Sequence, residues 1–102
     1  MRVIKRTTVR GFWERHPRAE PSLKQWLAIA EKAEWQSLLD VRRDFRSADA
    51  VKVRSGRTVT VFDIGGGRYR LITAIHYNTG KLFTLRFLTH AEYDKDKWKD
   101  QL

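Results

Sequence analysis

Cysteine is absent from this chain of 102 residues, which excludes disulfide bonds and thiolate chemistry. Histidine is scarce too, and the three histidines at positions 16, 76 and 90 lack a zinc-binding spacing. No apolar run approaches the roughly 18 residues that a membrane-spanning helix needs. The segment Met1–Arg6 has no apolar signal-peptide core. We therefore expect a cytoplasmic protein without a metal site or a membrane segment.

Acidic residues are few relative to basic ones. The sequence has 12 Asp and Glu against 21 Lys and Arg, a formal net charge of +9. An excess of this size favours a polyanionic partner, and nucleic acid is the usual one. Binding to a membrane surface would require a basic amphipathic helix or a lipidation signal, and the sequence shows neither. The four tryptophans and the 41% hydrophobic content indicate a single folded domain over residues 1–102.

The first half of the chain has a helical pattern. Thr7 or Thr8 can cap a helix that runs to about His16. Pro21 suits the first position of a second helix, and Ser37 can cap a third. Apolar residues at helical spacing, including three of the four tryptophans, are predicted to form the core rather than to stack on nucleobases.

The second half of the chain has the period of β-strands. Val3–Ile4 is predicted to form a first short strand near the N-terminus, and short turns separate the later strands. Such turns are too short for crossovers, so we expect an antiparallel meander with two or three helices on one face, an α+β sandwich. Gly65-Gly66-Gly67 lacks the pattern of a P-loop or dinucleotide site and is predicted to be a turn, leaving no cofactor motif. The predicted strands span 51–53, 58–64, 69–77 and 82–88.

The segment Thr89–Lys95 concentrates titratable side chains. Thr89 and Glu92 have the spacing of a capping box, which predicts that a helix starts there. In that helix His90, Tyr93 and Asp94 share one face. The free N–H groups of a helix start attract anions, so the segment suggests a phosphate site.

Strand alternation predicts which side chains share a face of the sheet. In the last strand Phe83, Leu85 and Phe87 would face the core, and Leu82, Thr84, Arg86 and Leu88 would face the other way. In the strand before it, Arg70 would project from the same open face as Arg86. Two guanidinium groups beside a helix start would bind phosphate strongly.

Other basic residues extend this candidate surface, although a solvated surface role is the alternative for each. Lys95 and Lys97 follow the predicted helix, and Arg68 precedes the Arg70 strand. His76 lies close to a turn, which favours surface decoration. We include these four residues as RNA-binding candidates.

Several segments carry a resemblance to a known family, and they run in order over nearly the whole chain. The chain resembles the HigB-type toxins of bacterial type II toxin–antitoxin systems, within the RelE-like superfamily. The Thr89–Lys95 motif is the most specific of the matches, whereas Tyr69-Arg70-Leu71 alone would be weak evidence for the family. The matching segments are 11–17, 35–37 with 40–41, 47–49, 69–72 and 89–95.

The resemblance implies a RelE-like fold and a ribosome-dependent mRNA interferase, which cleaves messages in the A site and is silenced by a HigA-type helix-turn-helix antitoxin. It implies that Arg70 contacts the scissile phosphate and that His90 and Tyr93 handle a proton or stack on a base. In the family the last-strand basic residue often stands one position farther from Thr89 than Arg86 does. Either a bulge returns Arg86 to the cleft, or Arg86 faces elsewhere.

These residues lead to one mechanistic hypothesis and one rival. In the hypothesis an RNA 2′-hydroxyl attacks the adjacent phosphate, with His90 as general acid or base, Tyr93 assisting, and Arg70, Arg86 and Lys95 stabilising charge. No metal is needed. The rival is a non-catalytic basic module that binds RNA or the ribosome and inhibits by occupancy.

Overall fold

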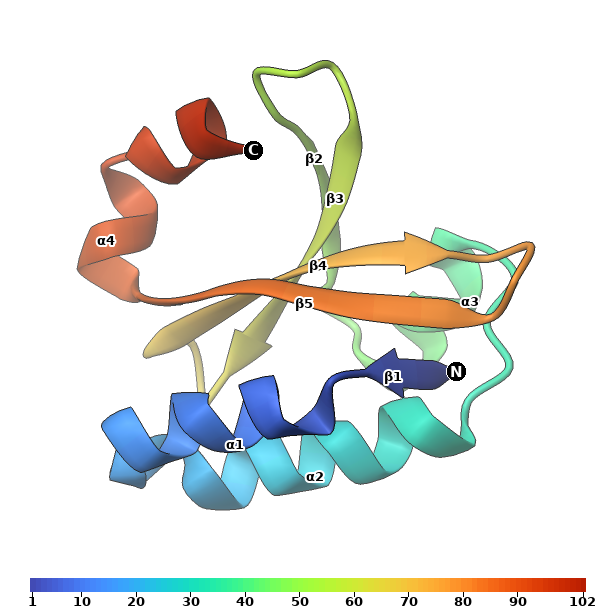
Figure 1. Ribbon diagram of the computed structural model, residues 1–102, viewed down its shortest axis with the longest axis horizontal. Helices are drawn as coiled ribbons and strands as arrows, with labels where there is room; N and C mark the ends of the chain where they lie inside the picture. Colours follow the sequence, from blue (N-terminus) through green and yellow to red (C-terminus); the bar gives the residue numbers. More distant parts are fainter.

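A five-stranded sheet forms the centre of the computed structural model, which describes residues 1–102 (Figure 1). The strand order is β1-β5-β4-β3-β2, and β2 to β5 form the predicted antiparallel meander. The N-terminal strand β1 pairs parallel with β5 at the edge, which the sequence did not predict and which makes the sheet mixed. The strands are β1 (Arg2–Ile4), β2 (Asp49–Lys52), β3 (Thr58–Ile64), β4 (Tyr69–His76) and β5 (Lys81–Thr89).

The helices lie on both sides of this sheet. In Figure 1, α1 and α2 run along one side of β1 and β5, whereas α4 and the C-terminal turn lie on the other side. The two or three N-terminal helices and the short C-terminal helix are thus confirmed. The helical segments are α1 (Arg6–Arg15), η1 (Pro17–Ala19), α2 (Glu20–Lys32), α3 (Leu38–Asp44), α4 (His90–Asp94) and η2 (Lys97–Gln101).

Two of the predicted helix starts are wrong. Helix α1 begins directly after Lys5, whose left-handed backbone (φ 58°) turns the chain out of β1, so Thr7 and Thr8 lie inside the first turn and cap nothing. Pro21 is the second residue of α2 rather than the first, because η1 leads into the helix. Ser37 does occupy the N-cap position of α3, although its side chain makes no capping hydrogen bond.

The main hydrophobic core fills the space between the sheet and helices α1, α2 and α3. It contains 16 buried residues, and aromatic pairs connect the layers. Phe12 of α1 stacks on Phe87 of β5, with ring centroids 5.4 Å apart, and Trp26 of α2 meets Phe62 of β3 edge-on at 5.5 Å. These helices are therefore held to the sheet by apolar burial, the dominant favourable contribution to folding.

A second, smaller core covers part of the opposite face, which the sequence predicted to be open. Trp98 of η2 is only 3% exposed and packs on β-strand valines. The backbone N–H of Arg54 donates to the carbonyl of Lys99 at 3.1 Å, which joins η2 to the segment between β2 and β3. The C-terminal segment therefore closes one end of this face and leaves the other end uncovered. The buried members are Val53, Val59, Val61, Ile72 and Trp98.

A β-bulge in β5 reverses part of the predicted alternation. The β4–β5 register shifts between Ile72 and Thr73, so that Leu85 is the extra residue. Before the bulge, Leu82 is fully buried in the main core and Phe83 faces the opposite side, the reverse of the prediction. Thr84 pairs with Thr73 and likewise lies on the helix side. After the bulge, the predicted faces are correct.

Candidate functional site

The capping box at the start of α4 is confirmed. The backbone N–H of Thr89 donates to Oε1 of Glu92 at 2.9 Å, and the N–H of Glu92 donates to Oγ1 of Thr89 at 3.2 Å. The hydrogen bond from the Thr89 backbone is the main cause that lowers the pKa of Glu92. The ionised carboxylate thus fixes the point at which α4 leaves β5.

The same hydrogen bonds remove the predicted anion site at this helix start. The N–H groups of Thr89 and Glu92 already have acceptors, and the N–H of His90 donates to the carbonyl of Arg68 at 2.9 Å. In addition, α4 has only five residues, so its dipole is small. An anion at this end of the sheet must therefore be bound by side-chain cations.

His90 forms a pair with Asp94 on the exposed side of α4. Nδ1 of His90 lies 2.7 Å from Oδ2 of Asp94, as the predicted i,i+4 spacing allows. Because a carboxylate only accepts hydrogen bonds, this contact places a proton on Nδ1 and leaves Nε2 of the neutral ring with a free lone pair. The His90 side chain is 57% exposed, so Nε2 is accessible to a large substrate.

Arg70 is held rigidly beside α4. Its Nε lies 2.9 Å from Oδ1 of Asp63, its partner in the β3–β4 register, and its Nη1 donates to the carbonyl of Gly67 at 2.6 Å. Its guanidinium carbon also lies 5.3 Å from the centroid of the Tyr93 ring. These contacts leave Nη2 as the guanidinium nitrogen without a protein partner.

Tyr93 is clamped between Arg70 and the C-terminal segment. Its ring stacks on Trp98 with centroids 5.3 Å apart and an interplanar angle of 19°, and its carbonyl accepts from Nε1 of Trp98 at 3.1 Å. Burial raises the pKa of Tyr93, whereas the charges of Lys99 and Arg70 lower it. The phenol is thus protonated at neutral pH and can donate a hydrogen bond or a proton.

The bulge returns Arg86 to the open face, which settles the alternative left open by the sequence. Arg86 pairs with Ile72 across β4–β5, and Arg70 pairs with Leu88 two residues away, so the two arginines are diagonal neighbours on one face. Nη1 of Arg86 donates to the carbonyl of Leu85 at 2.8 Å, and no carboxylate lies within ion-pair distance of Arg86. Arg86 therefore carries an uncompensated charge on this face, whereas the charge of Arg70 is shared with Asp63.

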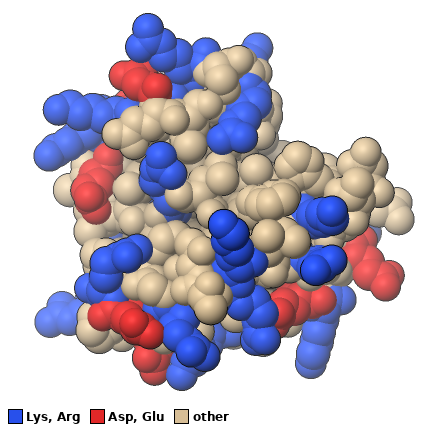
Figure 2. All heavy atoms as spheres, in the orientation of Figure 1, with Lys and Arg blue, Asp and Glu red and all other residues tan.

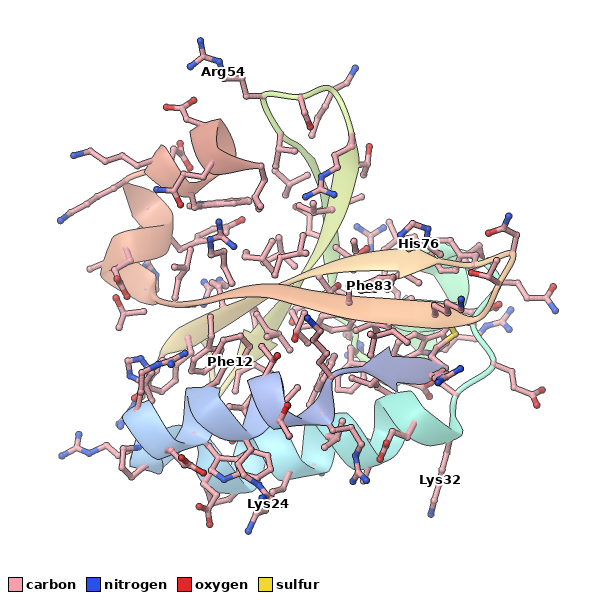
Figure 3. The ribbon with its side chains drawn as sticks, in the orientation of Figure 1. Phe12, Lys24, Lys32, Arg54, His76 and Phe83 are labelled. Carbon is pink, nitrogen blue, oxygen red and sulfur yellow. The ribbon has the colours of Figure 1, made fainter.

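The remaining candidates are divided between two places. Arg68 is exposed in the turn that contacts His90, and Lys95 and Lys97 line a hollow of about 290 Å³ between β5, α4 and η2. His76 lies at the far end of β4 and is not brought near His90 (Figure 3). The structure thus gathers the candidates around α4, apart from His76.

Three residues at this face were given no role by the sequence reasoning. The role of Asp63 could have been predicted from the hairpin around the Gly65–Gly67 turn. If Ile64 pairs with Tyr69 across that turn, the next pair outward is Asp63 with Arg70. No sequence pattern links Trp98 to Tyr93. Phe83 was assigned to the wrong face, because a bulge has no clear signal in a single sequence.

Basic side chains are spread over the surface around this site. Figure 2 shows Lys and Arg over much of the visible face, with fewer Asp and Glu. No group of three or more His, Cys, Asp and Glu side chains is placed to hold a metal ion. No helix of the structure has the length and apolar character needed to cross a membrane.

Comparisons with known proteins agree with the fold. The model of the HigB_toxin family, described as the RelE-like toxic component of a toxin–antitoxin system, matches residues 19–96. The chain belongs to this family. The match includes β2 to β5 and α4, and it ends just before η2. A curated relative, mRNA interferase HigB from Escherichia coli O6:H1, is 24% identical over 95 residues, which cover 93% of this chain and 90% of the relative.

Proposed function

We propose that this HigB-family toxin is an mRNA interferase, a metal-independent endoribonuclease that cleaves translated mRNA and so inhibits translation and growth. One observation carries the proposal: the His90–Asp94 pair of α4 lies at the same end of the sheet as Arg70 of β4 and Arg86 of β5. A proton carrier next to two guanidinium groups suits the cleavage of a phosphodiester. The printed name of the curated relative supports the same activity.

The proposed reaction uses the 2′-hydroxyl of the RNA as nucleophile. Its oxygen attacks the adjacent phosphorus and loses its proton to a base, while the bond from phosphorus to the 5′-oxygen breaks and that oxygen gains a proton. The products are a 2′,3′-cyclic phosphate and a 5′-hydroxyl end. His90 moves one of these protons through Nε2, and Asp94 holds the ring in the required tautomer and orientation.

Charge builds up on the phosphoryl oxygens during the attack, and the two arginines are placed to stabilise it. Arg70 offers Nη2 from a fixed position, which lowers the reorganisation needed at the transition state. Arg86 offers a guanidinium group without a competing carboxylate. Tyr93 keeps Arg70 in place through its ring and, being protonated, assists as a donor.

The partners follow from the charge and the family. A net charge of +9 favours binding to ribosomal RNA in the A site, with strong salt dependence. Lys95, Lys97 and Arg68 border the site and would contact RNA backbone there. A HigA-type helix-turn-helix antitoxin would silence the toxin, and both would act in the cytoplasm.

The test uses purified protein, ribosomes paused on a defined message, and mapping of new RNA ends. We expect cleavage by the natural protein, a loss of about 10²-fold or more for His90→Ala and Arg70→Ala, and a smaller loss for Arg86→Ala. Lys32→Ala is the matched control, because it removes an exposed cation at the end of α2, remote from the site (Figure 3). Inhibition of translation without new RNA ends would instead establish occupancy, the rival mechanism.

A further inference from the structure

The uncovered end of the open sheet face holds an aromatic pair that belongs to neither core. Phe83 of β5 is half-buried, and the exposed His76 of β4 meets its ring edge-on, with centroids 5.4 Å apart. Both lie at the end of β4 and β5 that is distant from α4 (Figure 3). An aromatic side chain that is left half-exposed on a sheet offers a face on which a planar group can stack.

The strand register places two basic residues beside this pair. Lys81 pairs with His76 across β4–β5, and Arg2 of the parallel edge strand pairs with Lys81. Phe83 itself pairs with Ala74 and, on its other side, with Ile4. The result is an aromatic and apolar row next to a basic row.

Carboxylates are missing from this whole part of the sheet. Residues 64–91, which include all of β4 and β5, contain no Asp or Glu, and neither does β1. Lys81, like Arg86, has no ion-pair partner. A ligand here would meet aromatic faces and unpaired cations, and no carboxylate of these strands would repel its phosphates. Such a surface suits a polyanion with planar rings.

The bulge at Leu85 is what creates this surface. It places Phe83 and Arg86 on the same face, although regular alternation would do so only for residues an even number apart. Arg86 thus stands between Phe83 and the Arg70 end of the site. A continuous track without acidic residues leads from the candidate cleavage site to the aromatic pair.

We infer that Phe83 and His76, with Lys81, form a stacking subsite for bases of single-stranded RNA, several nucleotides from the cleaved bond. The inference rests on the proposed RNA cleavage and extends it to the binding of the substrate strand. Arg70 and His76 stand six positions apart in β4, about 20 Å at the rise of a β-strand, which spans several nucleotides. Stacking on aromatic faces depends little on sequence, so this subsite would hold the strand without selecting a codon.

The test measures the affinity for a fluorescein-labelled 12-nucleotide RNA by anisotropy, in His90→Ala protein so that the RNA stays intact. We expect Phe83→Ala and Phe83→Leu each to weaken binding about tenfold, Phe83→Tyr to bind within about twofold, and all three to bind duplex RNA unchanged. Lys81→Ala should reduce the number of counterions released on binding, measured from the dependence of the affinity on salt concentration, by about one. Leu39→Ala, which alters an exposed apolar side chain of α3, is the control.

Two outcomes overturn the subsite. One is RNA binding by Phe83→Leu that equals the natural protein, since leucine keeps the apolar contacts without the ring. The other is unchanged RNA affinity together with weakened antitoxin binding, which would reassign the surface to a protein partner. Ribosomal cleavage is measured separately: loss of RNA affinity in Phe83→Ala with no cleavage by the natural protein supports the subsite and rejects the proposed nuclease.

Discussion

The two ends of the open sheet face differ in how much they contact the rest of the protein. At the α4 end, the His90–Asp94 pair, the Arg70–Asp63 pair and the Tyr93–Trp98 stack all hold functional groups in fixed positions. At the far end, the His76 ring meets Phe83 without forming a hydrogen bond or an ion pair, and Lys81 has no ion pair. The α4 end is therefore a site that is organised before a ligand arrives, whereas the side chains at the far end make few contacts within the protein.

This difference is what the two proposed tasks require. Groups that stabilise a transition state work best when they need no rearrangement, so intramolecular contacts at the α4 end favour catalysis. A surface that binds many sequences works best with unpaired cations and open aromatic faces. Changes at one end should therefore leave the other end functional, and the following predictions test that separation.

The largest effect is expected from Trp98→Ala. Removing this buried ring leaves a cavity under η2 and frees Tyr93, which should lower the free energy of unfolding by about 3–5 kcal/mol. Thermal or urea unfolding measures this loss. Below the melting temperature, RNA cleavage should fall sharply while the RNA affinity that depends on Phe83 persists. Trp98→Phe, which keeps a ring on Tyr93, should restore most of the cleavage; an equal loss of both properties would argue against separate ends.

A smaller effect is expected from Asp94→Asn. The amide can no longer hold the Nδ1 proton as a carboxylate does, so the His90 ring loses its fixed tautomer and cleavage should fall about 10- to 100-fold. Because both side chains are exposed, the unfolding midpoint should change little. An unchanged cleavage rate would remove Asp94 from the site.

The smallest effect is expected from Thr89→Ala, which breaks the capping box at a cost of about 1 kcal/mol. The pKa of Glu92 is lowered in the folded protein, so its stabilisation is present above the usual value of 4.5 and is lost as the pH falls through the lower folded value. Because Thr89→Ala keeps the backbone N–H that donates to Glu92, it retains most of this stabilisation. The difference in stability between Glu92→Gln and the natural protein should instead shrink as the pH falls below 4.5. A difference that stays constant into acid would show that Glu92 contributes nothing to the cap.

Sequence reasoning predicted the local features well and the long-range ones less well. The meander, the Thr89–Glu92 box and the i,i+4 contact of His90 depend on neighbours along the chain, and all are confirmed. The parallel pairing of β1 and the folding of Trp98 over the sheet depend on contacts between distant segments, which residue patterns do not reveal. The bulge at Leu85 was predictable only in part. The position of Arg86 in the sequence suggested that a bulge was possible, but the β4–β5 register was needed to show that Leu85 is the extra residue.

The RNA ends that the protein leaves on a message paused on the ribosome are the most direct test of the proposed cleavage. Transfer to the 2′-oxygen predicts a 5′-hydroxyl on one fragment and a 2′,3′-cyclic phosphate on the other, both lost with His90→Ala. Fragments with 5′-phosphate ends, or fragments that form equally well with His90→Ala, would contradict it.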